Sequence, residues 1–223
     1  MCALNPLRSH NGSMYAGIDG CRKGWVALVL PQQTLVEGFT SFMALADHLT
    51  DLGVTTLGVD MPIDPPEYGV RACDLAVKKA LGPKGSSLFI IPTRAALACP
   101  TQAEASRVNK AHGGAGVSAQ AFALRHKIAE VAQVGMEGII EVHPELTFHL
   151  LGNPQHSKRT WAGVRERLTI LQAQGLDPWS WPSTGWAATD DTLDAAAAAL
   201  SARRYACGEA VAHPEGPGPY IWA

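Results

Sequence analysis

Two apolar segments of the sequence each carry a glycine followed two residues later by an aspartate. The first, "MYAGIDG", contains Gly17 and Asp19, and the second, "GVTTLGVD", contains Gly58 and Asp60. Alternate side chains of a strand share a face, so each glycine would lie beside its carboxylate and leave space for a ligand or a metal ion. For either aspartate alone, a hydrogen bond within a turn is the ordinary explanation. The repetition favours one shared acidic site.

A third acidic segment, "TDDTLDAAAAAL", has the pattern of a helix start. Thr189 is predicted to cap the helix, and Asp190 and Asp191 in its first turn interact favourably with the helix dipole. Asp194 lies a turn further on, where that benefit has faded and aspartate is a poor helix former. Because residues i and i+3 are neighbours on a helix surface, Asp191 and Asp194 can both reach one ligand.

A fourth candidate segment is "EVHPELTF". A strand would present Glu141 and His143 on one face, and Glu145 follows the proline. The pattern is equally compatible with His143 as a ligand and with His143 at the start of a helix or in the core.

These residue types indicate a particular chemistry. Carboxylates from two strands and one helix, without a cysteine or histidine cluster, form a hard oxygen site suited to Mg²⁺ or Mn²⁺. Two such ions, about 4 Å apart, can activate water for attack at phosphorus and stabilise the leaving oxygen of a phosphodiester. The predicted metal ligands are four aspartates: Asp19, Asp60, Asp191 and Asp194.

The hydrophobic pattern predicts the elements that must position these side chains. Three short apolar runs within residues 14–39 predict three antiparallel strands, followed by a helix over 41–51 with Ser41 as N-cap and a strand over 55–60. From residue 71 the period is mainly helical, with one long helix predicted over 118–134. The remaining elements are a strand over 137–143, a helix after Pro144, a helix over 160–173, a Trp/Pro-rich loop over 177–186, a helix over 189–208 and a strand near 219–223.

Length and composition restrict the possible classes of protein. A chain of 223 residues is predicted to form one domain, residues 14–223, after a flexible leader, residues 1–13. The net charge of −2 and the lack of basic runs exclude a broad basic surface, so a nucleic-acid or nucleotide substrate would be held locally. We expect no membrane span and no signal peptide, and the five scattered cysteines favour a cytoplasmic protein.

Taken together, the motifs resemble those of domain-of-unknown-function family 429, a family described as predicted RNase H-like nucleases. The resemblance extends from about residue 14 to 210 and rests on seven segments in order: "GIDGCRKGWV", "GVDMPID", "SSLFIIPTRAAL", "SAQAFALRHKIAEV", "EVHPELTF", "SKRTWAGVRERL" and "DDTLDAAAAA".

The resemblance implies an α/β fold: an RNase H-like mixed five-stranded sheet flanked by helices. A mainly helical insertion, about residues 65–135, would separate strands 4 and 5. The final helix would bring Asp191 and Asp194, rather than Asp190, over the strands. Glu141 and Glu145 would be a further ligand and a family-specific addition to the catalytic set.

Polar residues of the predicted insertion also match family motif positions. They are Arg71, Asp74, Arg94, Gln120, Lys127 and Glu130. We expect substrate to be bound by basic residues that can neutralise its phosphates. The predicted substrate-binding residues are Arg71, Arg94, Lys127, Lys158 and His143. Lys127 and Glu130 are equally compatible with an ordinary i, i+3 pair on a helix.

The leading functional prediction is a metal-dependent nuclease or phosphodiesterase with two Mg²⁺ or Mn²⁺ ions. One alternative is an actin-like or sugar-kinase-type phosphotransferase or nucleotide phosphohydrolase. The phosphate-binding turn of such enzymes has the pattern Asp-x-Gly, whereas in this sequence Gly20 follows Asp19 directly. Another is a non-catalytic RNase H-like module that binds a partner through Trp179, Trp181 and Trp186, although these side chains would also serve to cover the edge of the core.

Overall fold

The computed structural model describes residues 12–182 and 185–223, so the predicted leader lies almost wholly outside the described residues. Close contacts divide the chain into two compact units. The first comprises the residues through Asp60, Met136–Val211 and Trp222–Ala223. The second comprises Met61–Gly135 and Ala212–Ile221.

The first unit is built on a mixed five-stranded sheet, which confirms the predicted α/β class. The strand order is β3-β2-β1-β4-β5. β1 pairs antiparallel with β2 and parallel with β4, β2 pairs antiparallel with β3, and β4 pairs parallel with β5. The strands are β1 (Met14–Cys21), β2 (Gly24–Leu30), β3 (Thr34–Phe39), β4 (Val54–Val59) and β5 (Ile139–Glu141).

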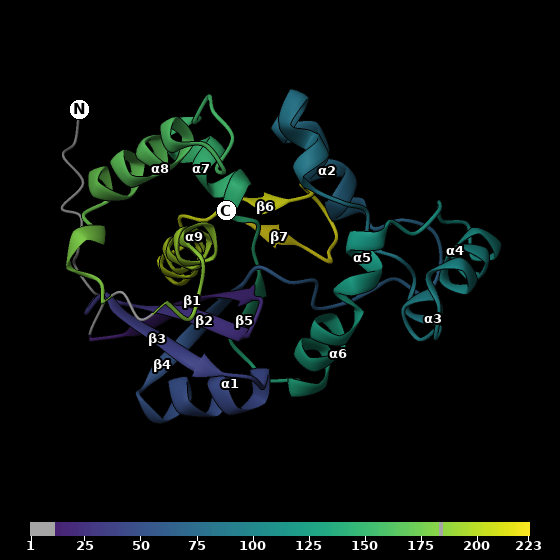
Figure 1. The fold of residues 1–223 in the computed structure, drawn as a ribbon, viewed down its shortest axis with the longest axis horizontal. Coiled ribbons are helices and arrows are strands. Elements are labelled where there is room, and N and C mark those ends of the chain that lie inside the picture. The colour runs from purple at the N-terminus through teal and green to yellow at the C-terminus, as the bar shows by residue number, and fades with distance from the viewer. Residues whose placement is uncertain (1–11, 183–184) are drawn as a thin grey trace. The chain divides into compact units, whose positions relative to one another are not determined.

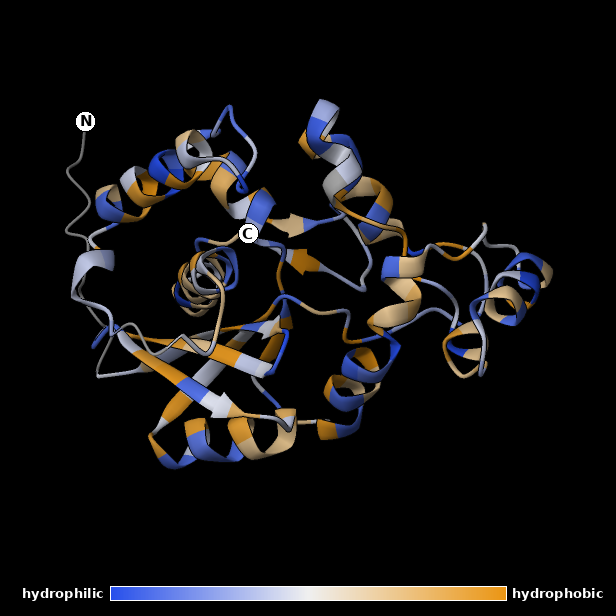
Figure 2. Cartoon of the chain, in the orientation of Figure 1, coloured by the Kyte–Doolittle hydropathy of each residue, from blue (hydrophilic) through white to orange (hydrophobic). Residues whose placement is uncertain are grey.

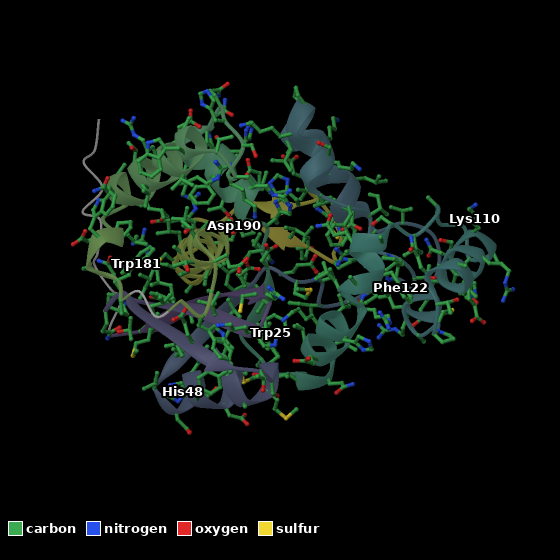
Figure 3. All side chains as sticks on the ribbon, in the orientation of Figure 1. Trp25, His48, Lys110, Phe122, Trp181 and Asp190 are labelled. Atoms are coloured by element: carbon green, nitrogen blue, oxygen red, sulfur yellow. The ribbon has the colours of Figure 1, made fainter. Side chains whose placement is uncertain are left out.

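Helices α1 (Phe42–Asp51) and α9 (Thr189–Ala206) lie on opposite faces of this sheet (Figure 1). Ser41 caps α1 as predicted. Phe42 packs edge-on against Trp25 of β2, with ring centroids 4.9 Å apart, and Trp25 is labelled in Figure 3. Because α1 buries its apolar stripe here, the sheet is covered on the face opposite α9.

Two further helices, α7 (Pro144–Gly152) and α8 (Trp161–Ala173), pack against α9. Their apolar residues, including Phe148 and Leu171, join side chains of β1, β2 and α9 in one buried cluster. Tyr15 of β1 and Leu28 and Leu30 of β2 are its buried strand residues, and β2 is largely hydrophobic along its length (Figure 2). A short 3₁₀ helix, η2 (Pro178–Ser180), lies within the predicted Trp/Pro-rich loop.

The second unit is mainly helical. Between β4 and β5 the chain forms α2 (Ala72–Leu81), a 3₁₀ helix η1 (Gly82–Ser87), α3 (Arg94–Leu97), α4 (Gln102–Ala111), α5 (Ala119–Ala123) and α6 (Arg125–Val134). Near the C-terminus, β6 (Ala212–His213) pairs with β7 (Ile221–Trp222).

The prediction of one long helix over 118–134 is wrong, because α5 and α6 are separate and meet at Leu124. The Arg125 guanidinium donates a hydrogen bond to the Phe122 carbonyl at 3.0 Å and lies over the Phe122 ring. In a continuous helix that carbonyl would accept from the amide of His126. Phe122 is labelled in Figure 3.

Over residues 12–182 and 185–223, no helix has both the length and the apolar character needed to cross a membrane.

Candidate metal centre

The two Gly-x-Asp motifs lie side by side on neighbouring parallel strands. Gly17 pairs with Gly58 and Ile18 with Val59, so Asp19 and Asp60 follow at the same edge of the sheet. The Asp60 amide donates to the Ile18 carbonyl at 2.9 Å, which fixes Asp60 just beyond β4. Asp19 Oδ1 also accepts from the Gly20 amide at 2.7 Å, so the expected turn hydrogen bond is present. The other carboxylate oxygen is not used by that bond.

The space beside the two glycines is filled by α9 rather than by a ligand, which corrects the sequence-based expectation. A Cβ at Gly17 would lie 1.9 Å from the Ala199 amide nitrogen and 2.2 Å from the Ala195 carbonyl oxygen. A Cβ at Gly58 would lie 2.6 Å from the Ala198 carbonyl oxygen. The glycines therefore allow the backbone of α9 to approach the sheet, with its alanines fully buried.

This close packing brings Asp194 to the same place as the two strand aspartates. Asp19, Asp60 and Asp194 each offer one carboxylate oxygen, and the three oxygens lie within 4.8 Å of one another. Asp19 and Asp194 are buried, and Asp60 is partly exposed. The three aspartates therefore form a compact donor set made of oxygen atoms alone. Of the three, Asp60 is the one that is partly exposed to solvent.

Burial and mutual repulsion raise the pKa values of all three carboxyl groups. Burial is the main cause at Asp19, whose pKa is raised well above its usual range, with further contributions from Asp60 and Asp194. Burial and then the Asp194 charge raise the pKa of Asp60 to about 8. Burial raises the pKa of Asp194 to about 6, against the opposing effect of Lys158. Ionisation of the whole set therefore calls for additional positive charge.

One cation of the chain is already present in the site. The Lys158 ammonium, from the loop between α7 and α8, donates a hydrogen bond to Asp194 Oδ2. Burial by itself would lower the pKa of Lys158, but the charge and hydrogen bond of Asp194, with contributions from Asp60 and Asp19, raise it above its ordinary value. Lys158 is therefore a fixed positive charge beside the carboxylates.

The start of α9 differs from the prediction in one respect. Ala188, not Thr189, is the N-cap: its backbone is extended, whereas Thr189 is already helical. The Ala188 amide donates to Asp191 Oδ2 at 3.2 Å, so Asp191 stabilises the helix start. Asp191 also lies near enough to raise the pKa of Asp19, although it is not one of the three clustered ligands. Asp190, labelled in Figure 3, likewise raises the pKa of Asp194.

The "EVHPELTF" segment divides between two environments. Glu141 is buried at the end of β5, opposite Val59, and its charge contributes to the raised pKa of Asp60. His143 lies beyond the strand as the N-cap of α7, where Nδ1 accepts from the Leu146 amide at 3.2 Å. Burial lowers the pKa of His143 to about 4, so it is neutral at neutral pH. The structure therefore places His143 at the start of a helix, which is one of the alternatives that the sequence left open.

Glu145 forms a bidentate ion pair with Arg167 of α8, with oxygen–nitrogen distances of 2.8 and 2.7 Å. The Arg167 side chain is 1% exposed and also donates to the carbonyls of His156 and Gly163. Sequence reasoning missed Arg167. Its signal was a charged residue in an otherwise apolar helical stripe, in which Gly163, Arg167, Ile170 and Leu171 recur at helical spacing.

The other predicted cations belong to the second unit. Arg71 is buried and donates to Asp74, and Arg94 is exposed between the carboxylates of Asp64 and Glu67. Lys127 lies on α6 and is partly exposed. Arg71 and Arg94 are thus already engaged by carboxylates within their own unit. The motif residues Gln120 and Glu130 lie on α5 and α6.

The tryptophans of the loop over 177–186 do not form one common surface. Trp181 packs against the main core, and Trp186 packs against the cluster around Cys21 and Val26. Trp179 is exposed. Two of the three rings therefore cover the core, in line with the simpler of the two sequence-based explanations.

Comparison with known proteins identifies the family of this chain, but the description of that family names no activity. A family model described as "Protein of unknown function (DUF429)" matches residues 17–218, a span that includes Asp19, Asp60, Lys158 and Asp194. A search of curated proteins finds no significant match, and a search of solved structures finds none either.

Proposed function

Because this chain belongs to the DUF429 family, whose description names no activity, we propose a function from its site: metal-dependent hydrolysis of phosphodiester bonds in nucleic acid. The observation that carries the proposal is the convergence of Asp19, Asp60 and Asp194, with carboxylate oxygens within 4.8 Å of one another. Such convergence of carboxylates, two of them buried, is costly to a protein unless protons or cations bind there.

The donor set fits Mg²⁺ or Mn²⁺. All three donors are carboxylate oxygens, and no thiol or imidazole is among them, which favours hard cations over zinc or copper. Asp19, Asp60 and Asp194 would hold the cation, with Glu141 and Asp191 close enough to tune it through their charges. When bound, a divalent cation lowers the pKa of water and stabilises negative charge on a phosphoryl group.

The order of the strands supports an RNase H-like interpretation of this site. One acidic residue lies on β1, one follows the adjacent parallel strand β4, and one lies on the final long helix, α9. That is the distribution which the family resemblance implies. His143, neutral and occupied as a helix cap, is not needed as a ligand in this proposal.

The test is cleavage of labelled DNA, RNA and branched junctions by the full chain with Mn²⁺, with ATP as a mononucleotide control. We expect Asp60→Asn to reduce Mn²⁺-dependent cleavage by more than about 100-fold, beyond the usual effect of losing an outer-shell partner of a metal site. Asp47→Asn, which removes an exposed carboxylate from α1, is the matched control and should retain activity. Equal cleavage by wild type and Asp60→Asn would refute the proposal.

A further inference from the structure

Lys158 is in direct contact with the carboxylate set. Its ammonium donates to Asp194 Oδ2, and the Asp194 side chain is only 5% exposed. The charges of Asp60 and Asp19 also act on this ammonium, and the contact itself is with Asp194. The Lys158 side chain is 36% exposed, yet its ammonium is held by a ligand of the proposed metal site.

The loop that carries Lys158 is fixed on both sides. Before it, the His156 amide and ring bind the two oxygens of Glu166 at 2.9 and 2.7 Å, and the His156 carbonyl accepts from the buried Arg167. After it, the Thr160 hydroxyl donates to the Ser157 carbonyl at 2.8 Å.

The same loop packs tightly on α8. A Cβ at Gly163 would lie 2.0 Å from the Ser157 carbonyl oxygen, so the loop backbone rests directly on that helix. The backbone on either side of Lys158 is therefore held by α8, and the ammonium at the end of the side chain is held by Asp194.

The contact of Lys158 with Asp194 bears on the number of metal ions. Two ions held by three carboxylates would have to share their oxygens, and one of these oxygens, Asp194 Oδ2, already accepts from the Lys158 ammonium. When the three donors are ionised, the ammonium and a single divalent cation together match their three negative charges. The charges of Glu141, Asp190 and Asp191 act on this set from outside it. Buried charges are tolerated when they are balanced and hydrogen-bonded.

We infer that the Lys158 ammonium occupies the second cation position of this site, so that the protein binds one divalent cation where the sequence predicts two. The inference rests on the proposed function, because it assumes that the carboxylates bind a metal. It assigns Lys158 as a positioning residue that holds Asp194 and supplies one of the two positive charges.

The stoichiometry of Mn²⁺ binding tests this directly. Calorimetric titration of the full wild-type chain should give one ion, and electron paramagnetic resonance should show an isolated Mn²⁺ without spin–spin broadening. Lys158→Met removes the charge but keeps a long side chain, and we expect it to bind two ions. Lys158→Arg should still bind one. Arg159→Met, which removes the neighbouring exposed cation, is the matched control and should also bind one.

The outcomes separate the inference from the proposed function. Two bound ions in the wild-type chain would overturn the inference while supporting a metal site, and this measurement needs no variant to fold. A folded Lys158→Met chain that binds a single ion, at any affinity, would also overturn it. Absence of Mn²⁺ binding by wild type and by all variants would overturn both.

Discussion

Asp74 in the second unit and Asp194 in the first are both buried aspartates on helices, yet their surroundings differ. Asp74 accepts from the Arg71 guanidinium at 3.0 Å through Oδ1 and from the Ile91 amide at 3.1 Å through Oδ2. Asp194 accepts from Lys158 and shares its surroundings with two further carboxylates. Both oxygens of Asp74 thus have donors within its own unit.

The two aspartates differ in how far the chain itself balances their charge. The Asp74 carboxylate is matched by one guanidinium and one amide, so its environment is balanced without a ligand. Around Asp194 three carboxylates meet one ammonium, and burial and repulsion raise their pKa values. An imbalance of this kind is stable only if protons or cations bind, and the proposal of a metal site depends on this difference.

We expect the largest loss of stability from a change at Asp74, whose charge is balanced within its own unit. We predict that Asp74→Ala lowers the free energy of unfolding by about 3–5 kcal/mol, because it removes one partner of a buried ion pair. Urea unfolding at pH 8 in the presence of a chelator would measure this loss. Under the same conditions Asp60→Asn should be no less stable than wild type. If both variants lose stability equally, the distinction between the two regions fails.

The next effect is a pH dependence confined to the acidic set. The pKa of Asp60 is about 8 in the folded chain, against 3.8 for an ordinary aspartate. A raised folded-state pKa contributes stability below the unfolded value, and that stability is lost as pH rises through the folded value. The metal-free chain should therefore lose stability steadily between pH 4 and 8, with Asp19 and Asp194 acting in the same direction as Asp60.

Thermal unfolding in chelator across this pH range measures the trend. Asp60→Asn should flatten the loss of stability with rising pH, and Asp47→Asn, which alters an exposed carboxylate, should leave it unchanged. Saturating Mn²⁺ should stabilise the wild-type chain most at the alkaline end, because only ionised carboxylates bind metal. A metal-free chain whose stability rises steadily from pH 4 to 8 would contradict the assigned pKa shifts.

The smallest effect comes from moving α9 without altering a charge. Gly58→Ala would place a methyl group 2.6 Å from the Ala198 carbonyl oxygen, so the helix must shift. We predict a loss of roughly 1–3 kcal/mol in unfolding free energy, typical of overpacking, together with weaker Mn²⁺ binding as Asp194 moves. Chemical denaturation and metal titration measure the two effects.

Gly116→Ala is the matched control for this change, because the added methyl group would meet only the Lys110 side chain at 4.0 Å. It should have little effect on stability or metal binding. Unchanged Mn²⁺ affinity in Gly58→Ala would show that the position of Asp194 does not depend on this contact.

Much of the fold was predictable because the periodic patterns are local. Alternating runs predicted the three antiparallel strands, and Ser41 predicted the start of α1. The prediction failed where a side chain bonds to a backbone group. The Arg125 guanidinium bonds to the Phe122 carbonyl where α5 and α6 are separate, and the Asp191 carboxylate accepts from the amide of Ala188, which caps α9 in place of Thr189. Such bonding depends on where a side chain points, which periodicity does not contain.

The candidate site was predictable in its carboxylates and not in their partners. Asp19, Asp60 and Asp194 were all named from residue type and spacing, and they do converge. Arg167, which holds Glu145 and the loop carrying Lys158, was missed because its partners are 22 and 11 residues away. Ion pairs between separate elements leave no local pattern.

The sequence by itself determined that two strands and one helix each carry an aspartate. Side-chain alternation in a strand and the 3.6-residue period of a helix are local rules, and they place Asp19 and Asp60 on the same strand face as a glycine and Asp194 one turn into a helix. That the three meet was implied by the family resemblance and not by these rules. Only the tertiary structure decided what the neighbouring glycines do. They make room for the alanines of α9, and that close approach of two backbones brings Asp194, and through it Lys158, to the strand carboxylates.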